Sequence, residues 1–213
     1  MSTAARFDAV IFDNDGLLLD TEQAWTRAEQ TLFARRGRTF TSEQKLELLG
    51  TTGAMAQGKL AAMLELPDAG EALLKELQAL ALEEIARSAP PRPGALELIA
   101  RLRAQSMPLG LASNSTRAFV DQALAAAGIA KATFAATCAG DEVANPKPAP
   151  DIYLTVCAAL GVDPVRTAVL EDSPTGVAAA IAAGCYVIGI PSIEGVRLEH
   201  ASITAPSLAL APL

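Results

Sequence analysis

The feature that most constrains the fold is the alternation of short apolar runs with helical patterns between residues 95 and 190. The apolar runs predict strands near 109–112, 133–137, 168–170 and 186–190, and helical patterns occupy 95–104, 117–127, 152–160 and 177–183. Strands that alternate with helices of this length join by right-handed crossovers into a parallel sheet covered on both faces. The predicted fold class is therefore α/β, with a Rossmann-like doubly wound parallel sheet.

A long helical segment interrupts this pattern after its first strand. The run 7–12 is rich in Val, Ile and Phe and ends at the turn sequence 13–16, as expected of a buried strand. Residues 21–87 are rich in strong helix formers, with breaks near 37, 50–53 and 67–70, and three prolines mark a linker at 90–94. We predict two domains: a Rossmann-like core at 1–18 plus 91–213, and an all-helical insert at 19–90.

Charge and hydropathy exclude several classes of partner. The net charge is −7 and no run of Lys or Arg occurs, which argues against a nucleic-acid partner. The most apolar stretch, 176–190, is interrupted by Gly184 and Gly189 and is too short for a membrane span, and the N-terminal apolar run is too short for a signal peptide. We expect a cytoplasmic protein with no membrane partner, and a monomer.

The histidine and cysteine content limits the possible chemistry. His200 is the only histidine, so mechanisms that need a catalytic His or a His-rich zinc site are disfavoured. Cys138, Cys157 and Cys185 are widely spaced and odd in number, so they predict small buried side chains rather than disulfides or a metal site.

Polar side chains gather where the predicted strands end. In an open parallel sheet, functional groups lie beyond the carboxyl ends of the strands. Four carboxylates, a lysine between two prolines and a hydroxyl suit a hard divalent cation and a phosphoryl group. These residues are Asp13, Asp15, Ser113, Lys147, Glu171 and Asp172, and Asn114 follows Ser113 at the same strand end.

Each of these pieces also has an ordinary structural interpretation. Residues 14–16 form a common turn sequence, Ser173–Pro174 resembles a helix N-cap, residues 113–116 offer another cap, and Lys147 alone would be a surface charge. These interpretations leave unexplained why all the pieces occur at strand or helix ends of one sheet. The spacing matches no EF-hand, and no phosphate-binding loop or serine-hydrolase motif is present.

Four segments together resemble motifs one to four of the haloacid dehalogenase superfamily. They are residues 12–22 (FDNDGLLLDTE), 112–115 (ASNS), 146–148 (PKP) and 170–173 (LEDS). The resemblance covers nearly the whole chain and is to the branch with a helical cap after motif one. That branch includes β-phosphoglucomutase and many sugar-phosphate phosphatases.

The resemblance implies a role for each motif residue. Asp13 would be the nucleophile that forms an aspartyl-phosphate, and Asp15 the general acid and then the base. Mg²⁺ would be the cofactor, held by Asp13, Asp172 and the backbone carbonyl of Asp15 and supported by Glu171. The groups implied to bind the phosphoryl oxygens are Gly16, Ser113, Asn114 and Lys147.

Departures from the mutase pattern favour simple hydrolysis. The mutase resemblance would require a His where Trp25 stands, and an Arg in the loop 50–53, which has none. Dehalogenase and phosphonatase members lack the second Asp, here Asp15. The expected function is a Mg²⁺-dependent phosphatase for a small phosphorylated metabolite such as a sugar or polyol phosphate. A mutase and a catalytically silent binding protein remain the alternatives.

The cap is expected to close over the site and to select the substrate. Candidate specificity residues are Glu22, Trp25, Thr51, Thr52 and Lys59. Each also has an ordinary interpretation, since Trp25 can be a helix-face hydrophobe and Lys59 a solvated helix charge.

Overall fold

The computed structural model describes residues 7–48, 51, 53–192 and 195–213, which form two compact units. The larger unit, the core, comprises Met1–Asp20 and Pro90–Leu213, and the smaller unit, the cap, is Thr21–Ala89. The junctions predicted from the sequence, after residues 18 and 90, lie within two residues of these bounds.

The core is built on a parallel sheet of six strands in the order β3-β2-β1-β4-β5-β6. This confirms the predicted α/β class and places the first strand at the centre, where all five of its residues are buried. The strands are β1 (Ala9–Asp13), β2 (Leu109–Ser113), β3 (Ala136–Ala139), β4 (Thr167–Glu171), β5 (Tyr186–Gly189) and β6 (Ile203–Thr204).

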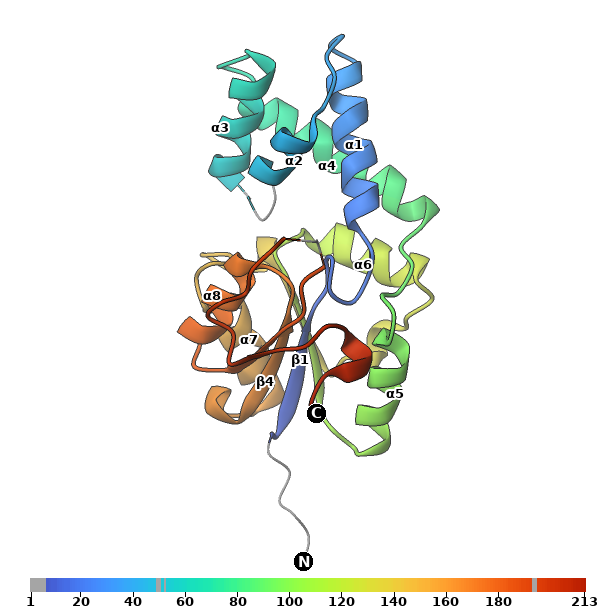
Figure 1. Cartoon of the computed structure of the whole chain (residues 1–213), viewed down its shortest axis with the longest axis vertical. Helices are drawn as coiled ribbons and strands as arrows, with labels where there is room; N and C mark the ends of the chain where they lie inside the picture. Colours follow the sequence, from blue (N-terminus) through green and yellow to red (C-terminus); the bar gives the residue numbers. More distant parts are fainter. Residues whose placement is uncertain (1–6, 49–50, 52, 193–194) are drawn as a thin grey trace, which may run out of the picture. The chain divides into compact units, whose positions relative to one another are not determined.

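Helices cover both faces of this sheet. Figure 1 shows α7 (Asp151–Leu160) and α8 (Pro174–Ala182) on one side of β1 and α5 (Ala95–Ala104) on the other. The remaining core helix, α6 (Arg117–Ala126), follows β2 in the chain. Ile152 and Val156 of α7 are buried and pack in one cluster with Ile11 of β1 and Val169 of β4. Burial of these branched side chains holds α7 firmly over the central strands.

Two details of the sheet differ from the prediction. The third strand begins at Ala136 rather than at 133, because Lys131–Thr133 form a 3₁₀ turn. The edge strand β6 was not predicted, since its two exposed residues present no apolar run. The three cysteines are buried and free, as expected. Among the described residues, no helix is long and apolar enough to cross a membrane.

The described residues of the cap form four helices. These are α1 (Glu22–Ala34), α2 (Ser42–Leu48), α3 (Gly53–Leu64) and α4 (Gly70–Arg87), with α1 and α3 both packed on α4. α4 is amphipathic, since Leu77, Ala81 and Ile85 recur at helical spacing and are buried. The breaks expected near 37 and 67–70 fall between helices.

A buried ionic cluster joins two cap helices. Glu29 of α1 is only 4% exposed, and its carboxylate lies 3.0 Å from the ammonium of Lys45 of α2. Glu22, two turns earlier on α1, lies 3.1 Å from the same ammonium. Burial raises the pKa of Glu29 to about 7, although Lys45 opposes the shift.

Replacing Glu29 by glutamine is expected to remove part of the pH dependence of stability. Because the folded-state pKa of Glu29 is raised, its contribution to stability is greatest below about pH 4.5 and falls as the pH rises toward 7. The fall corresponds to roughly 3 kcal/mol. Urea unfolding across this range should show Glu29→Gln gaining stability relative to wild type as pH increases. Glu43→Gln, an exposed control on α2, should not, and equal behaviour of the two variants would contradict the assignment.

Candidate active site

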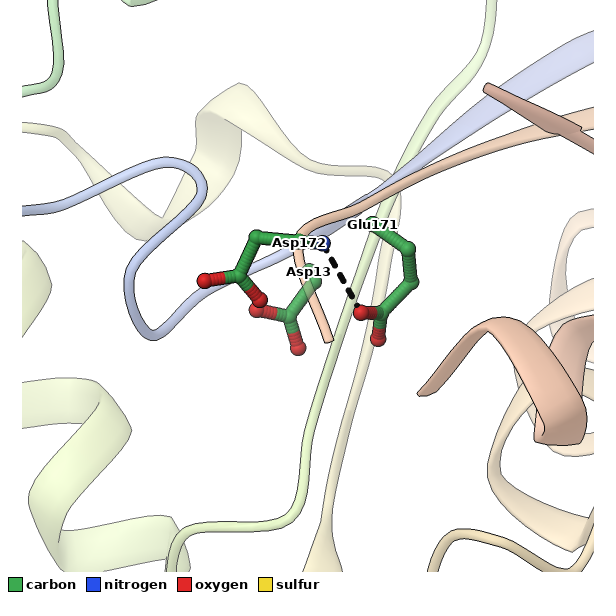
Figure 2. A group of neighbouring side chains, drawn as sticks. All are labelled: Asp13, Glu171 and Asp172. Carbon is green, nitrogen blue, oxygen red and sulfur yellow. Dashed lines mark hydrogen bonds between the residues drawn. The ribbon is translucent and has the colours of Figure 1, made fainter. Parts of the chain in front are cut away.

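The register of three strands brings the predicted catalytic side chains to one edge of the sheet. Asp13 pairs with Ala112 of β2, and Phe12 pairs with Leu170 of β4. On one side of Asp13, Ser113 of β2 therefore lies one residue further along, and on the other side Glu171 of β4 lies level with it. Figure 2 shows the carboxylates of Asp13, Glu171 and Asp172 turned toward a common point.

Lys147 supplies a buried positive charge to this point. Its ammonium lies 2.6 Å from Oδ1 of Asp13, 2.7 Å from Oε1 of Glu171 and 3.3 Å from the carbonyl oxygen of Ala112. Burial alone would lower the pKa of Lys147, but the two carboxylates outweigh it and raise that pKa well above its usual range. Lys147 is therefore an ammonium ion whose three N–H groups all have acceptors.

The backbone of Lys147 is held by a second motif residue. The side-chain amide of Asn114 accepts a hydrogen bond from the Lys147 N–H (2.8 Å) and donates one to its carbonyl oxygen (3.1 Å). Pro146 and Pro148 flank the lysine, and the Lys147–Pro148 peptide is cis. The Asn114 side chain thus orients the loop that carries Lys147.

Asp15 is placed by a tight turn after β1. Gly16 has a φ of +79°, and its N–H donates to the carbonyl oxygen of Leu19. A Cβ at Gly16 would collide with the carboxylate of Asp172, so only glycine permits this approach. Oδ2 of Asp15 accepts hydrogen bonds from Ser113 Oγ (2.6 Å) and Ser115 Oγ (2.9 Å).

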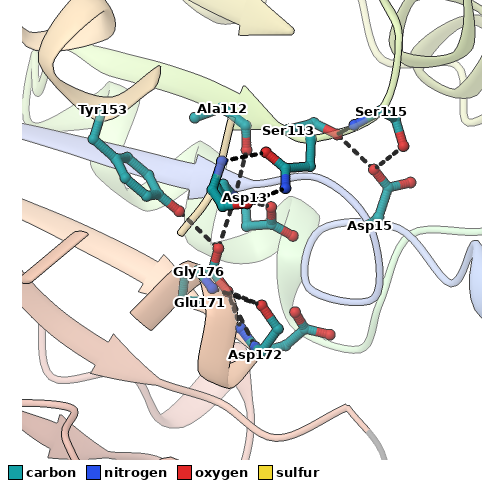
Figure 3. A network of polar contacts seen from close by, with 12 residues as sticks. Asp13, Asp15, Ala112, Ser113, Ser115, Tyr153, Glu171, Asp172 and Gly176 are labelled. Atoms are coloured by element: carbon teal, nitrogen blue, oxygen red, sulfur yellow. Dashed lines mark hydrogen bonds and ion pairs between the residues drawn. The ribbon is translucent and has the colours of Figure 1, made fainter. Parts of the chain in front are cut away.

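Glu171 is the most heavily hydrogen-bonded carboxylate of the site. Its Oε1 accepts from Lys147 and from the hydroxyl of Tyr153 (2.7 Å), and its Oε2 accepts from the N–H groups of Asp172 and Ser173 and from Ser173 Oγ. Figure 3 shows this network together with Gly176 of α8. A Cβ at Gly176 would overlap the Glu171 carboxylate, so the close approach of α8 requires glycine there.

Tyr153 of α7 is a buried part of the same network. It is fully buried, and its ring centroid lies 4.9 Å from the Lys147 ammonium. Burial raises the pKa of Tyr153 well above its usual range, so the phenol keeps its proton and donates a hydrogen bond to Glu171. Tyr153 thereby helps to fix the carboxylate that in turn holds Lys147.

The carboxylates fit a hard divalent cation. Oxygen atoms of Asp13, Glu171 and Asp172 lie within 4.8 Å of one another, and all three residues are buried. When ionised they carry three negative charges against the one positive charge of Lys147, so a divalent cation would balance the site. Ser192 Oγ holds Asp172 Oδ2 at 2.5 Å, which orients that carboxylate.

Without a cation, Asp13 lies in an unfavourable environment for a negative charge. Burial raises the pKa of Asp13 well above its usual range, and the carboxylates of Glu171, Asp172 and Asp15 add to the effect, while Lys147 opposes it. An ionised Asp13 therefore needs more positive charge nearby than Lys147 alone supplies. A divalent cation bound by Asp13, Glu171 and Asp172 would supply it.

A model of the haloacid dehalogenase-like hydrolase family matches residues 7–184, which span both units. The chain belongs to the haloacid dehalogenase-like hydrolases. This membership confirms the resemblance inferred from the four motifs, and the segments that carry it are those that meet at the carboxyl ends of β1, β2 and β4.

Named relatives of this haloacid dehalogenase-like hydrolase include phosphatases. It is 39% identical to Protein CbbY of Rhodobacter capsulatus over 86% of this chain and 85% of that one, and 32% identical to hexitol phosphatase B of Escherichia coli over 91% and 88%. The crystal structure of CbbY from Rhodobacter sphaeroides in complex with phosphate superposes with a TM-score of 0.83, at 30% identity over 95% of each chain. The chain is a phosphoric monoester hydrolase.

The specificity residues predicted for this hydrolase all belong to the cap. The Glu22 carboxylate contacts Lys45, and the Lys59 ammonium contacts the carbonyl oxygen of Glu47. Thr51 Oγ1 donates to the carbonyl oxygen of Leu48 at 2.7 Å, and Trp25 is partly buried on α1. Thr52 lies outside the described residues. Their part in substrate selection stays a prediction.

Four residues of the hydrolase site were missed by reasoning from the sequence. Tyr153 occupies an apolar helix face and looks like an ordinary core residue. Ser192 follows a strand and a proline with no motif around it. Ser115 and Gly176 lie in or beside motifs but carry no signal of the contacts they make, which depend on the fold.

Proposed function

We propose that this hydrolase is a Mg²⁺-dependent phosphatase that acts on a small phosphorylated metabolite, a sugar or polyol phosphate, through a phosphorylated Asp13. The observation that carries the proposal is the convergence of Asp13, Lys147 and Asp15 at one sheet edge. Together they supply a nucleophile, a cation for phosphoryl oxygens and an acid.

Each residue performs a distinct part of the reaction. Asp13 attacks phosphorus through a carboxylate oxygen, and the bond to the leaving oxygen breaks as Asp15 gives that oxygen a proton. Asp15 then takes a proton from water as the water attacks the aspartyl-phosphate, which releases phosphate and restores Asp13. Lys147 neutralises charge on the phosphoryl oxygens, and Ser113 and the backbone N–H of Asn114 donate hydrogen bonds to them. The N–H of Gly16 already donates to Leu19, so Gly16 contributes by shaping the turn that places Asp15.

Mg²⁺ would be held by Asp13, Asp172 and the backbone carbonyl of Asp15, with Glu171 in support. When bound, it supplies charge neutralisation that lets an anionic nucleophile approach an anionic phosphate. Two observations support this assignment: the oxygens of Asp13, Glu171 and Asp172 lie close together, and burial disfavours an ionised Asp13 without a cation.

Features of the cap favour hydrolysis over phosphoryl transfer between two positions of a sugar. A mutase has to hold a second phosphate while the intermediate turns over. Trp25 replaces the His of the mutase pattern, and the segment 50–53 carries no Arg. In addition, Lys45 of the cap is already paired with Glu22 and Glu29. The relationship to hexitol phosphatase B supports a polyol or sugar phosphate as substrate.

Phosphate release from p-nitrophenyl phosphate, with Mg²⁺ and with a chelator, tests the proposed activity. We expect turnover only with Mg²⁺, and a panel of phosphates should give a kcat/KM for hexitol or sugar phosphates at least about tenfold above that for nucleotides. Absence of Mg²⁺-dependent release would favour a binding protein. Conversion of a hexose 1-phosphate to its 6-phosphate faster than phosphate release would favour a mutase.

A further inference from the structure

Two serine hydroxyls converge on one oxygen of Asp15. Ser113 Oγ lies 2.6 Å and Ser115 Oγ 2.9 Å from Oδ2, as the dashed lines in Figure 3 show. The backbone N–H of Ser115 also donates to Ser113 Oγ at 3.0 Å. Ser113 Oγ thus accepts a hydrogen bond from the N–H of Ser115 and donates its own proton to Asp15.

This arrangement determines which oxygen of Asp15 can carry a proton. Oδ2 already accepts two O–H donors, so a third proton there would have to displace one of them. Oδ1 is buried and has no hydrogen-bond partner in the part of the chain that the structure describes. A protonated Asp15 therefore carries its proton on Oδ1, which is free to donate it.

We propose that Ser115 is a positioning residue for Asp15: with Ser113, it occupies Oδ2 and so presents the transferable proton on Oδ1. The inference rests on the proposed function, in which Asp15 is the acid. Ser113 is also implied to bind the phosphoryl group. The hydroxyl of Ser115, among the described residues, contacts Asp15 alone, so a change at Ser115 tests the positioning of Asp15 separately from phosphoryl binding.

The other contacts of Ser115 do not depend on its hydroxyl. The N-cap of α6 is Thr116, whose Oγ1 accepts from the N–H of Phe119. The carbonyl oxygen of Ser115 accepts from the N–H of Gly140, and its N–H donates to Ser113, both through the backbone. Ser115→Ala therefore removes only the bond to Oδ2 and leaves the helix start and loop intact.

The test is the dependence of kcat/KM on the leaving group, which reports all steps up to departure of the alcohol. An alkoxide needs the proton from Asp15, whereas p-nitrophenolate departs without it. For Ser115→Ala we expect a loss of about tenfold or more with an alkyl phosphate such as glycerol phosphate, and a loss of less than about twofold with p-nitrophenyl phosphate. Ser115→Thr, which retains the hydroxyl, should recover the activity.

Asp15→Asn serves as the reference, because it should show the same selectivity with a larger loss. Thermal unfolding of each variant reports on folding separately. Suppose that Asp15→Asn loses activity mainly with the alkyl phosphate, but Ser115→Ala loses activity equally with both esters or loses none with the alkyl phosphate. The inference about Ser115 is then wrong, and the proposed function stands. If wild type releases no phosphate from either ester, both are wrong.

Discussion

Asp13→Asn is expected to reduce Mg²⁺-dependent phosphate release to a few per cent of the wild-type rate or less. A carboxamide is too weak a nucleophile to form the aspartyl-phosphate, so the loss is in kcat and amounts to at least about 2 kcal/mol of transition-state stabilisation. The same variant should fold as well as wild type or better in the absence of metal. Burial disfavours the Asp13 anion, and Lys147 keeps its second partner, Glu171, at 2.7 Å.

Measuring kcat and urea unfolding on the same metal-free preparation, with Mg²⁺ added only for the kinetics, separates the two effects. Asp8→Asn is a suitable control, because Asp8 is an exposed carboxylate paired with Arg166 on the protein surface. It should leave kcat unchanged. An Asp13→Asn protein that retains more than a few per cent of the rate would show that another residue is the nucleophile.

Lys147→Met is expected to reduce both activity and stability. Methionine fills the space of the lysine stem but leaves Asp13 and Glu171 buried without their ammonium partner. Removing one member of a buried ionic group lowers the free energy of unfolding by about 3–5 kcal/mol. Losing the positive charge that faces the phosphoryl group lowers kcat by roughly 10²–10³-fold. Urea unfolding with a chelator present, together with steady-state kinetics, measures the two losses.

Lys131→Met provides the matched control. Lys131 is an exposed lysine paired with Asp121 at 3.1 Å, and such a pair contributes less than about 1 kcal/mol. The destabilisation by Lys147→Met should also shrink as pH falls, because the unpaired carboxylates then take up protons. Equal stability of the two methionine variants at neutral pH would mean that Lys147 does not neutralise the buried carboxylates.

The sheet and its strand ends were predictable because they follow from short-range pattern. Apolar runs bounded by turn residues locate β1, β2, β4 and β5, and the rule that functional groups lie beyond the carboxyl ends places Asp13, Ser113 and Glu171 together. The structure brings Lys147 to the same point, although the residues alone also allowed a surface lysine.

The rest depends on contacts that no local pattern specifies. Tyr153 has the helical spacing of a core residue, and only the packing of α7 on the sheet brings its hydroxyl to Glu171. Glu29 and Lys45 would each be interpreted as surface charges, and their pairing requires α1 and α2 to meet. The orientation of Asp15 depends on the hydroxyls of Ser113 and Ser115, which lie about a hundred residues away in the sequence.

The central claim, that Asp13 becomes phosphorylated, is tested most directly by trapping the intermediate. Asp15→Asn should still release p-nitrophenolate, which needs no proton, but should hydrolyse the aspartyl-phosphate slowly because the base is missing. Acid quenching after mixing with p-nitrophenyl phosphate and Mg²⁺, followed by peptide mass spectrometry, should show a stoichiometric burst and a phosphorylated Asp13. No burst, or a phosphoryl group on any other residue, would contradict the account.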